Sequence, residues 1–203
     1  MENYNLIEQV RFKDVDTYFK SICEIDLNNI YSILKYSMIN ERKISLRFIE
    51  WFILYYCKKN NIFINMKNGQ RYFYDEFNDD LLNTNVYINI YNDYKLQLKY
   101  HTKKYFDPFK RQTVFNYSLL DSDNTIETTI SQLNFFKWLH QNNILTFIIE
   151  NLHFLKKEMV YFNKEIKNNK LSEQVKKSRI SSISSSATKD DITLDFDSYD
   201  VSV

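Results

Sequence analysis

The sequence predicts an α+β fold, and three features of the residue pattern predict it. In the N-terminal third and the C-terminal half, apolar residues recur every three or four positions, the period of an amphipathic helix. Between these regions lie two hairpin signals, each flanked by short alternating segments. From residue 170 onward, serines and lysines replace most large apolar residues. We therefore expect one α+β domain over residues 1–169 and a flexible tail over residues 170–203 that ends in a short β-like segment.

Three helices are expected in the N-terminal third. Asp14 or Asp16 can cap the first, over residues 18–25, because a carboxylate accepts hydrogen bonds from the free amides of a first turn. The second begins at about Asp26 and carries apolar residues at three- and four-residue spacing. Ser45 precedes the third, whose C-terminal lysines suit the negative end of the helix dipole.

The middle of the chain predicts a first hairpin and then an ambiguous segment. Residues 62–66 form the first expected strand, Asn68-Gly69 is a strong hairpin turn, and residues 70–74 return as the partner strand. An acidic, Asn-rich loop is expected over residues 75–85. The segment that follows fits both the alternation of a strand and the spacing of a helix, and we favour a helix over residues 87–103.

A second hairpin and two helices are expected after the only proline. Residues 113–119 and 125–129 alternate as strands on either side of a polar turn. Ser131 is expected to cap a helix over residues 133–141, and another helix over residues 144–167 carries a clear apolar stripe. The aromatic side chains of the first of these helices are expected in the core rather than as a stacking surface for bases.

Composition limits the classes of function. The chain has 203 residues and 44% of them are apolar, so it can bury a substantial core. Its formal net charge of +1 means that nucleic-acid binding requires local clusters of charge. Because Gly69 is the only glycine, glycine-rich phosphate loops and the GxSxG nucleophile elbow are excluded. We expect no enzyme.

Neither a metal nor a secretory pathway is indicated. Cys23 and Cys57 lack the spacing of a metal or redox pair, and we expect both as buried, reduced thiols. His101, His140 and His153 lie far apart without cysteines at zinc spacing, so no metal and no cofactor are predicted. The first residues lack the pattern of a signal peptide, and no apolar run reaches the roughly 18 residues of a membrane span.

A basic run is the candidate binding site. Its six cations, against Asp107 as the single acid, are Lys95, Lys99, Lys103, Lys104, Lys110 and Arg111. On a continuous helix the first three would share one face, where like charges repel each other unless an anion is near. Nucleic-acid phosphates and an acidic protein surface both fit that description. A solvated face neutralised by the acidic loop over residues 75–80 is the third open interpretation.

The tail holds a smaller basic cluster, Lys176, Lys177 and Arg179, among serines. It fits contact with anions, phosphorylation that would reverse its charge, or a merely solubilising role. The final segment, residues 192–203, alternates with period two and could add a strand to this domain or to a partner.

Four blocks of the sequence resemble a known family. They are Leu46–Phe52 with Tyr56–Asn60, Tyr94–Lys99 with Lys104–Phe109, Glu127–Trp138, and Ser184–Lys189. In this order, across roughly residues 44–197, they resemble an uncharacterised family of nucleocytoplasmic large DNA viruses. The chain departs from the family pattern at Lys110-Arg111, where a cysteine and paired arginines are usual, and at Ser131, where a glycine is usual. These departures weaken the expectation of a strongly basic surface.

The resemblance implies a viral protein of the host cytoplasm (the viral factory) or of the virion, and it supplies no reaction. We therefore expect a non-enzymatic protein that binds nucleic acid or a viral protein partner in late gene expression or particle assembly. The alternative is a virion structural or scaffold protein that acts through protein–protein contacts. Its oligomeric state is not predicted.

Overall fold

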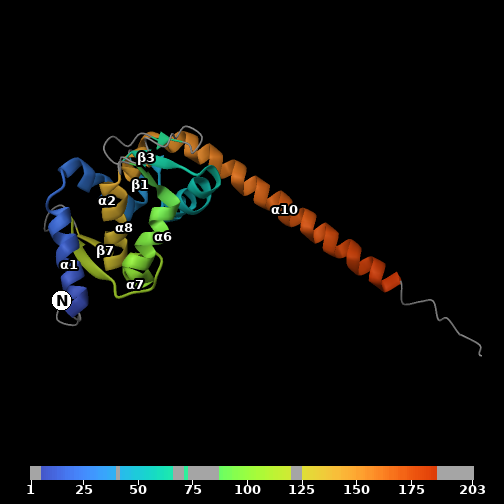
Figure 1. Cartoon of the computed structure of the whole chain (residues 1–203), viewed down its shortest axis with the longest axis horizontal. Helices are drawn as coiled ribbons and strands as arrows, with labels where there is room; N and C mark the ends of the chain where they lie inside the picture. The colour runs from blue at the N-terminus through green and yellow to red at the C-terminus, as the bar shows by residue number, and fades with distance from the viewer. Residues whose placement is uncertain (1–5, 40–41, 66–70, 73–86, 120–124, 187–203) are drawn as a thin grey trace, which may run out of the picture. The chain divides into compact units, whose positions relative to one another are not determined.

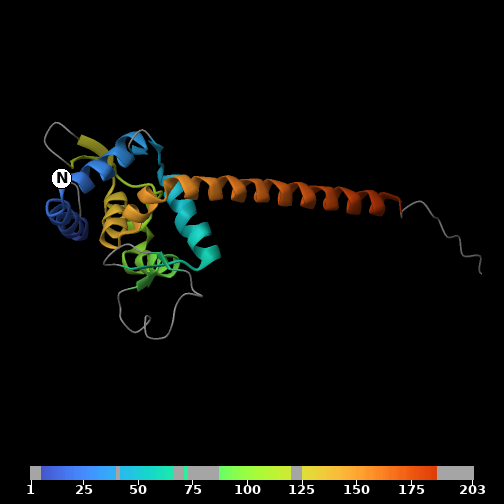
Figure 2. The same cartoon turned by 90° about the horizontal axis from the view of Figure 1, so that it is seen from above.

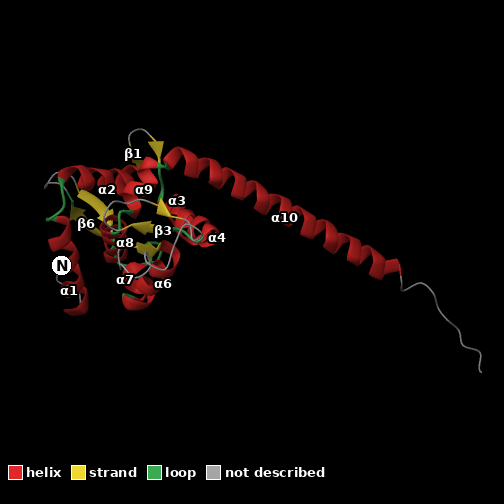
Figure 3. Cartoon of the chain, turned by 45° about the horizontal axis from the view of Figure 1, so that its top comes forward, coloured by secondary structure: helices red, strands yellow, loops and turns green. Residues whose placement is uncertain are grey.

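The computed structural model describes residues 6–39, 42–65, 71–72, 87–119 and 125–186, with backbone alone from residue 171 onward. Helices and short antiparallel strand pairs make up these residues, so the α+β class is confirmed (Figures 1 and 3). The chain divides into two compact units, Met1–Leu155 and Lys156–Val203.

The described helices are distributed along the sequence of the first unit. They are α1 (Leu6–Phe19), α2 (Glu24–Tyr36), α3 (Leu46–Trp51), the π-helix η1 (Phe52–Cys57), α4 (Lys58–Asn60), α6 (Ile90–Tyr100), α7 (Thr102–Phe106), α8 (Ile130–Gln141) and α9 (Ile144–Glu150). Helix α10 (Leu152–Ser186) begins in the first unit, and the rest of it belongs to the second.

The described strands form three small antiparallel sheets. They are β1 (Met38–Ile39) with β2 (Arg42–Lys43), β3 (Phe63–Asn65) between β4 (Arg71–Tyr72) and β5 (Tyr87–Asn89), and β6 (Phe115–Ser118) with β7 (Thr125–Thr128). Both predicted hairpin pairings are confirmed, with Phe63 opposite Tyr72 and Tyr117 opposite Ile126. Their turns, and the predicted acidic loop over residues 75–85, lie outside the described residues.

The first predicted helix was placed wrongly. Helix α1 ends at Phe19, so Asp14 and Asp16 lie inside it rather than at its start. Leu6, Ile7 and Val10 are apolar but exposed, so the apolar residues of α1 do not lie on one face and the sequence shows no amphipathic period there. The two carboxylates instead join elements, because Asp14 pairs with Lys137 on α8 and Asp16 accepts a hydrogen bond from Tyr117 on β6.

The predicted helix over residues 87–103 is also corrected. Both of its patterns are present, one after the other: Tyr87–Asn89 is strand β5, and α6 begins at Ile90. The Asn89 side chain accepts a hydrogen bond from the Asn92 amide and so caps α6. The helix ends at Tyr100, because Thr102 has a positive φ of 62° and α7 starts there.

The C-terminal helices differ from the prediction in their caps and lengths. Thr129 caps α8 by accepting from the Gln132 amide, whereas Ser131 is fully buried and hydrogen-bonded to Thr129. A break at Asn151 separates α9 from α10, and α10 continues to Ser186 instead of ending near residue 167. The flexibility of residues 170–203 stays a prediction, and the β-like final segment lies outside the described residues.

Helix α8 lies at the centre of the first unit, packed against α1, α7 and α9 (Figures 1 and 2). Phe135, Phe136 and Trp138 on this helix are at most 4% exposed, which confirms the prediction that its aromatic side chains form core. Rings of Tyr94 on α6 and Phe106 on α7 lie 5.7–6.2 Å from those of Phe135 and Trp138. The two helices that carry most of the basic run are therefore anchored on α8.

Candidate functional site

The cations of the predicted run are spread over three elements. Lys95 and Lys99 lie on α6, Lys103 and Lys104 on α7, and Lys110 with Arg111 in the loop that leads to β6; all six are exposed. Because the helix is interrupted at Thr102, Lys103 does not continue the row of Lys95 and Lys99 on one helix. The six charges therefore have different surroundings.

Lys95 shares one aromatic ring with a lysine from another element. Its Nζ lies 5.5 Å from the ring centroid of Tyr91, one turn earlier on α6, and Lys58 Nζ lies 5.4 Å from the same centroid. Lys58 begins α4, and its contact follows from the packing of α6 against η1. Sequence reasoning noted Lys58 only as a helix-end charge, since nothing local relates it to a ring 33 positions later.

Lys99 lies one turn after Lys95 on α6, and Tyr91, Lys58, Lys95 and Lys99 together are called the Tyr91 cluster below. Its three lysines are exposed, and none of them forms an ion pair within the part of the chain that the structure describes. A cation over an aromatic face gains about 0.5–1 kcal/mol at an exposed site, which partly offsets the repulsion of neighbouring ammonium groups. The cluster is therefore a cationic surface with an aromatic centre.

Lys104 is already neutralised by the protein itself. Its Nζ donates to Glu8 Oε1 at 2.7 Å and lies 4.9 Å from the Tyr105 ring centroid. The hydrogen bond from Lys104 to Glu8 raises the pKa of the lysine. Of the predicted cations, Lys104 is thus the least suited to bind an external anion.

The tail cluster cannot be placed in the same way. Lys176, Lys177 and Arg179 lie on the backbone of α10, in the stretch where side chains are not described. Their role as an anion contact stays a prediction.

A polar network links three helices near the end of α8. The Tyr18 hydroxyl lies 2.5 Å from His140 Nδ1, and His140 Nε2 lies 3.0 Å from Asp26 Oδ2. Cys23, which was wrongly expected to be buried, is exposed and donates its thiol hydrogen to Asp26 at 3.0 Å. This network was missed from the sequence because its members come from α1, α2 and α8.

The pKa values in this network follow from burial and hydrogen bonding. Burial, reinforced by the charge of Asp26, raises the pKa of Tyr18 to about 12. Burial alone would raise the pKa of Asp26, but hydrogen bonds from Cys23 and His140 outweigh it and leave the pKa below its ordinary value. A phenol that ionises only in strong alkali and a carboxylate held ionised suit a structural link better than proton transfer at neutral pH.

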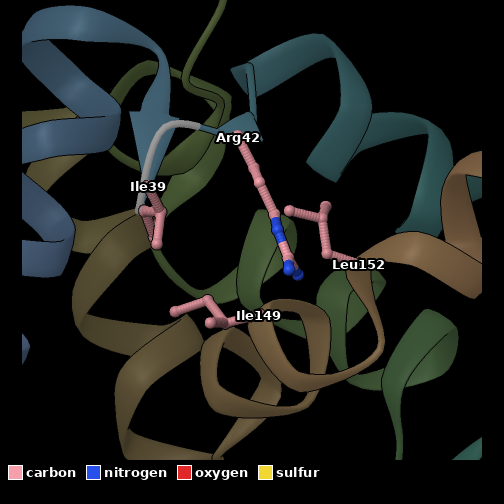
Figure 4. Close-up of a pocket in the computed structure, with 4 residues that line it drawn as sticks. All are labelled: Ile39, Arg42, Ile149 and Leu152. Atoms are coloured by element: carbon pink, nitrogen blue, oxygen red, sulfur yellow. The ribbon is translucent and has the colours of Figure 1, made fainter.

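A small pocket lies beside the β1–β2 pair. Ile39, Arg42, Ile149 and Leu152 line it, and the Arg42 side chain reaches toward Ile149 and Leu152 from β2 (Figure 4). Its volume of about 180 Å³ is below the roughly 300–1,000 Å³ of typical small-molecule sites. The pocket therefore gives little support for a small-molecule substrate.

Two further observations concern the described residues alone. They contain no group of three or more His, Cys, Asp or Glu side chains arranged to hold a metal ion. Among them, no helix combines the length and the apolar character needed to cross a membrane.

Comparison with known proteins places the chain in a family. The model of a family of unknown function, DUF7197, matches residues 8–202. The chain belongs to this family. It is also 34% identical, over 167 residues, to the uncharacterized protein L507 of Acanthamoeba polyphaga mimivirus. That alignment covers 78% of this chain and 59% of the mimivirus protein. No solved structure matches the chain significantly.

The giant-virus resemblance seen in the four sequence blocks is confirmed at the level of the family. The relative comes from a mimivirus, and neither the DUF7197 family nor that relative has a known function. This DUF7197 chain is thus an uncharacterised viral protein.

Proposed function

We propose that this chain is a non-enzymatic nucleic-acid-binding protein of a large DNA virus. Its binding surface is the Tyr91 cluster. The observation that carries the proposal is the convergence of Lys58 and Lys95 on one ring, at 5.4 and 5.5 Å from its centroid. Two ammonium groups that share a ring repel each other, and a phosphate group between them relieves that repulsion.

The viral relative supports the proposed setting. Late gene expression and particle assembly both bring proteins to viral nucleic acid, in the viral factory of the host cytoplasm or in the virion. The cations of the Tyr91 cluster are lysines, which bind phosphates as point charges. Binding is therefore expected to tolerate many sequences and to weaken steeply with salt.

The test is fluorescence anisotropy of the full chain with labelled single- and double-stranded DNA between about 50 and 200 mM salt. The triple variant K58Q/K95Q/K99Q removes the cluster's charge, and K13Q/K43Q/K157Q removes the same charge from exposed lysines elsewhere. On duplex DNA the cluster variant should lower the slope of log affinity against log salt by up to about 2.7, at ~0.9 per phosphate contact. The control variant should change it much less.

Two results would contradict the proposal: no DNA or RNA binding even at the lowest salt, or equal losses in both triple variants. The second would show that only total charge matters. The alternative function, a virion structural or scaffold protein, is favoured by the exposed apolar residues Leu6, Ile7 and Val10 on α1. Recovery of the chain in fixed stoichiometry from purified particles, without nucleic-acid binding, would support that alternative.

A further inference from the structure

An apolar groove lies between the start of α1 and the end of α6. Leu6, Ile7 and Val10 line it from α1 and Tyr100 lines it from α6. Arg11, Asp14 and His101 complete the lining, and the volume is about 440 Å³. The four apolar side chains are 59–78% exposed. Isolated exposed apolar residues are common, but four of them around one groove of ligand-binding size mark an interaction surface.

Arg11 gives this groove a positive charge. Its Nη1 lies 2.9 Å from His101 Nδ1, and its guanidinium carbon lies 4.7 Å from the Tyr105 ring centroid. Neither of these partners is an acid. Among the residues that the structure describes, the Arg11 Nε donor has no hydrogen-bond acceptor.

The acids closest in sequence to Arg11 have other partners. Glu8 binds Lys104 at 2.7 Å, and Asp14 binds Lys137 at 2.8 Å. A cation that has no carboxylate partner among the described residues, in a mainly apolar groove, favours an occupant that has both apolar side chains and carboxylates.

The chain itself contains a segment with that chemistry. Residues 190–203 read DDITLDFDSYDVSV, with five aspartates, no basic residue, and apolar or aromatic residues between the acids. We propose that this segment, from a second copy of the chain, occupies the groove. Its apolar side chains lie against Leu6, Ile7, Val10 and Tyr100, and an aspartate pairs with Arg11. This inference is independent of nucleic-acid binding.

A second copy is the favoured source because of the element that precedes the segment. Within its own unit, α10 runs as one helix from residue 156 to Ser186, about 45 Å at 1.5 Å per residue. A segment beyond such a spacer can reach a neighbouring chain without folding back along its own helix. Exchange of segments between identical copies is a low-cost route to association.

The first experiment measures binding of a fluorescein-labelled peptide of residues 190–203 to the full chain by anisotropy. Val10→Asp places a charge in the groove wall, and Ile25→Asp is its matched control, because Ile25 is 73% exposed on α2 and Val10 is 61% exposed on α1. V10D and R11Q should each weaken peptide binding at least about tenfold, the effect of 1.4 kcal/mol, while I25D binds as the unmodified chain does.

The second experiment measures self-association of the full chain by light scattering over a range of concentrations. Concentration-dependent association should be lost in L194S/F196S, which still binds the wild-type peptide because its groove is intact. An unmodified chain that stays monomeric while binding the peptide would overturn the second copy as the source. Peptide binding unchanged in V10D, or lost only in K58Q/K95Q/K99Q, would overturn the groove as the site.

Discussion

The indole nitrogen of Trp138 donates a hydrogen bond of 2.5 Å to the carboxylate of Asp93, and this bond joins α8 to α6. Trp138 is 4% exposed, so its N–H has little access to water as an alternative acceptor. Asp93 lies two positions from Tyr91 and from Lys95, and it therefore holds α6 in the position that brings Lys95 and Lys58 to one ring. Helix α6 thus contributes both to the buried core and to the candidate surface.

Substitution of Asp93 tests that link. Asp93→Ala leaves the buried indole N–H without a partner and should lower the free energy of unfolding by about 1–3 kcal/mol. Asp93→Asn keeps an acceptor oxygen and should lower the free energy of unfolding by less. Urea denaturation monitored by tryptophan fluorescence measures both values. Glu127→Ala, at an exposed position on β7, is the control, and an equal loss in that variant would argue against the hydrogen bond as the cause.

The sequence predicted those parts of the fold that depend on neighbouring residues. Both hairpin pairings follow from local alternation and turn residues, and the burial of α8 follows from its spacing. Helix α1 was misplaced because its exposed apolar residues conceal its period. The β1–β2 pair was missed because strands of two residues carry no periodic signal.

The candidate site was predicted less well, for a physical reason. A count of charges treats all six cations alike. Tertiary packing, however, pairs Lys104 with the carboxylate of Glu8 and brings Lys58 to the same aromatic ring as Lys95. Glu8 and Lys58 lie 96 and 37 positions away from Lys104 and Lys95 in the sequence. Contacts over such separations are set by how helices pack, and a single sequence does not reveal them.

Acid should destabilise the protein in part through His101. Burial, with the charges of Arg11 and Lys137, lowers the pKa of His101 below 6.5, its ordinary value. Between these two pKa values the unfolded chain binds the proton more readily, so the free energy of unfolding falls as the pH drops below about 6.5. Asp26, whose pKa is lowered from 3.8, contributes a separate loss in more acidic solution.

Urea denaturation at a series of pH values measures this dependence. His101→Gln should remove the component near pH 6, whereas His153→Gln, at an exposed position on α10, should leave it in place. A pH profile that is the same in H101Q as in the unmodified chain would assign the acid sensitivity to other groups.

The aromatic core beneath the basic run should be sensitive to truncation. Phe106 is fully buried, stacks on His101 with ring centroids 5.5 Å apart, and contacts Tyr94 and Trp138. Phe106→Ala should lower the free energy of unfolding by about 3–5 kcal/mol, because it removes buried apolar surface and leaves a cavity. Thermal and urea unfolding measure the loss. Phe109→Ala, at a half-buried position in the next loop, should cost clearly less.

Lys104 and Lys95 should respond differently to the same substitution. The Lys104 side chain is 51% exposed and pairs with a Glu8 side chain that is 16% exposed. Because an ion pair near the surface contributes only about 0–1 kcal/mol, Lys104→Gln should have a small effect on stability. It should also leave the salt dependence of DNA binding nearly unchanged, since the pair with Glu8 already neutralises that charge.

Lys95→Gln should instead lower the slope of log affinity against log salt by about 0.9, the contribution of one phosphate contact. Anisotropy titrations of the two single variants, made with the same DNA and salt series, compare them directly. If K104Q lowers the slope as much as K95Q does, binding depends on the charge of the whole run, and the Tyr91 cluster has no special part in it.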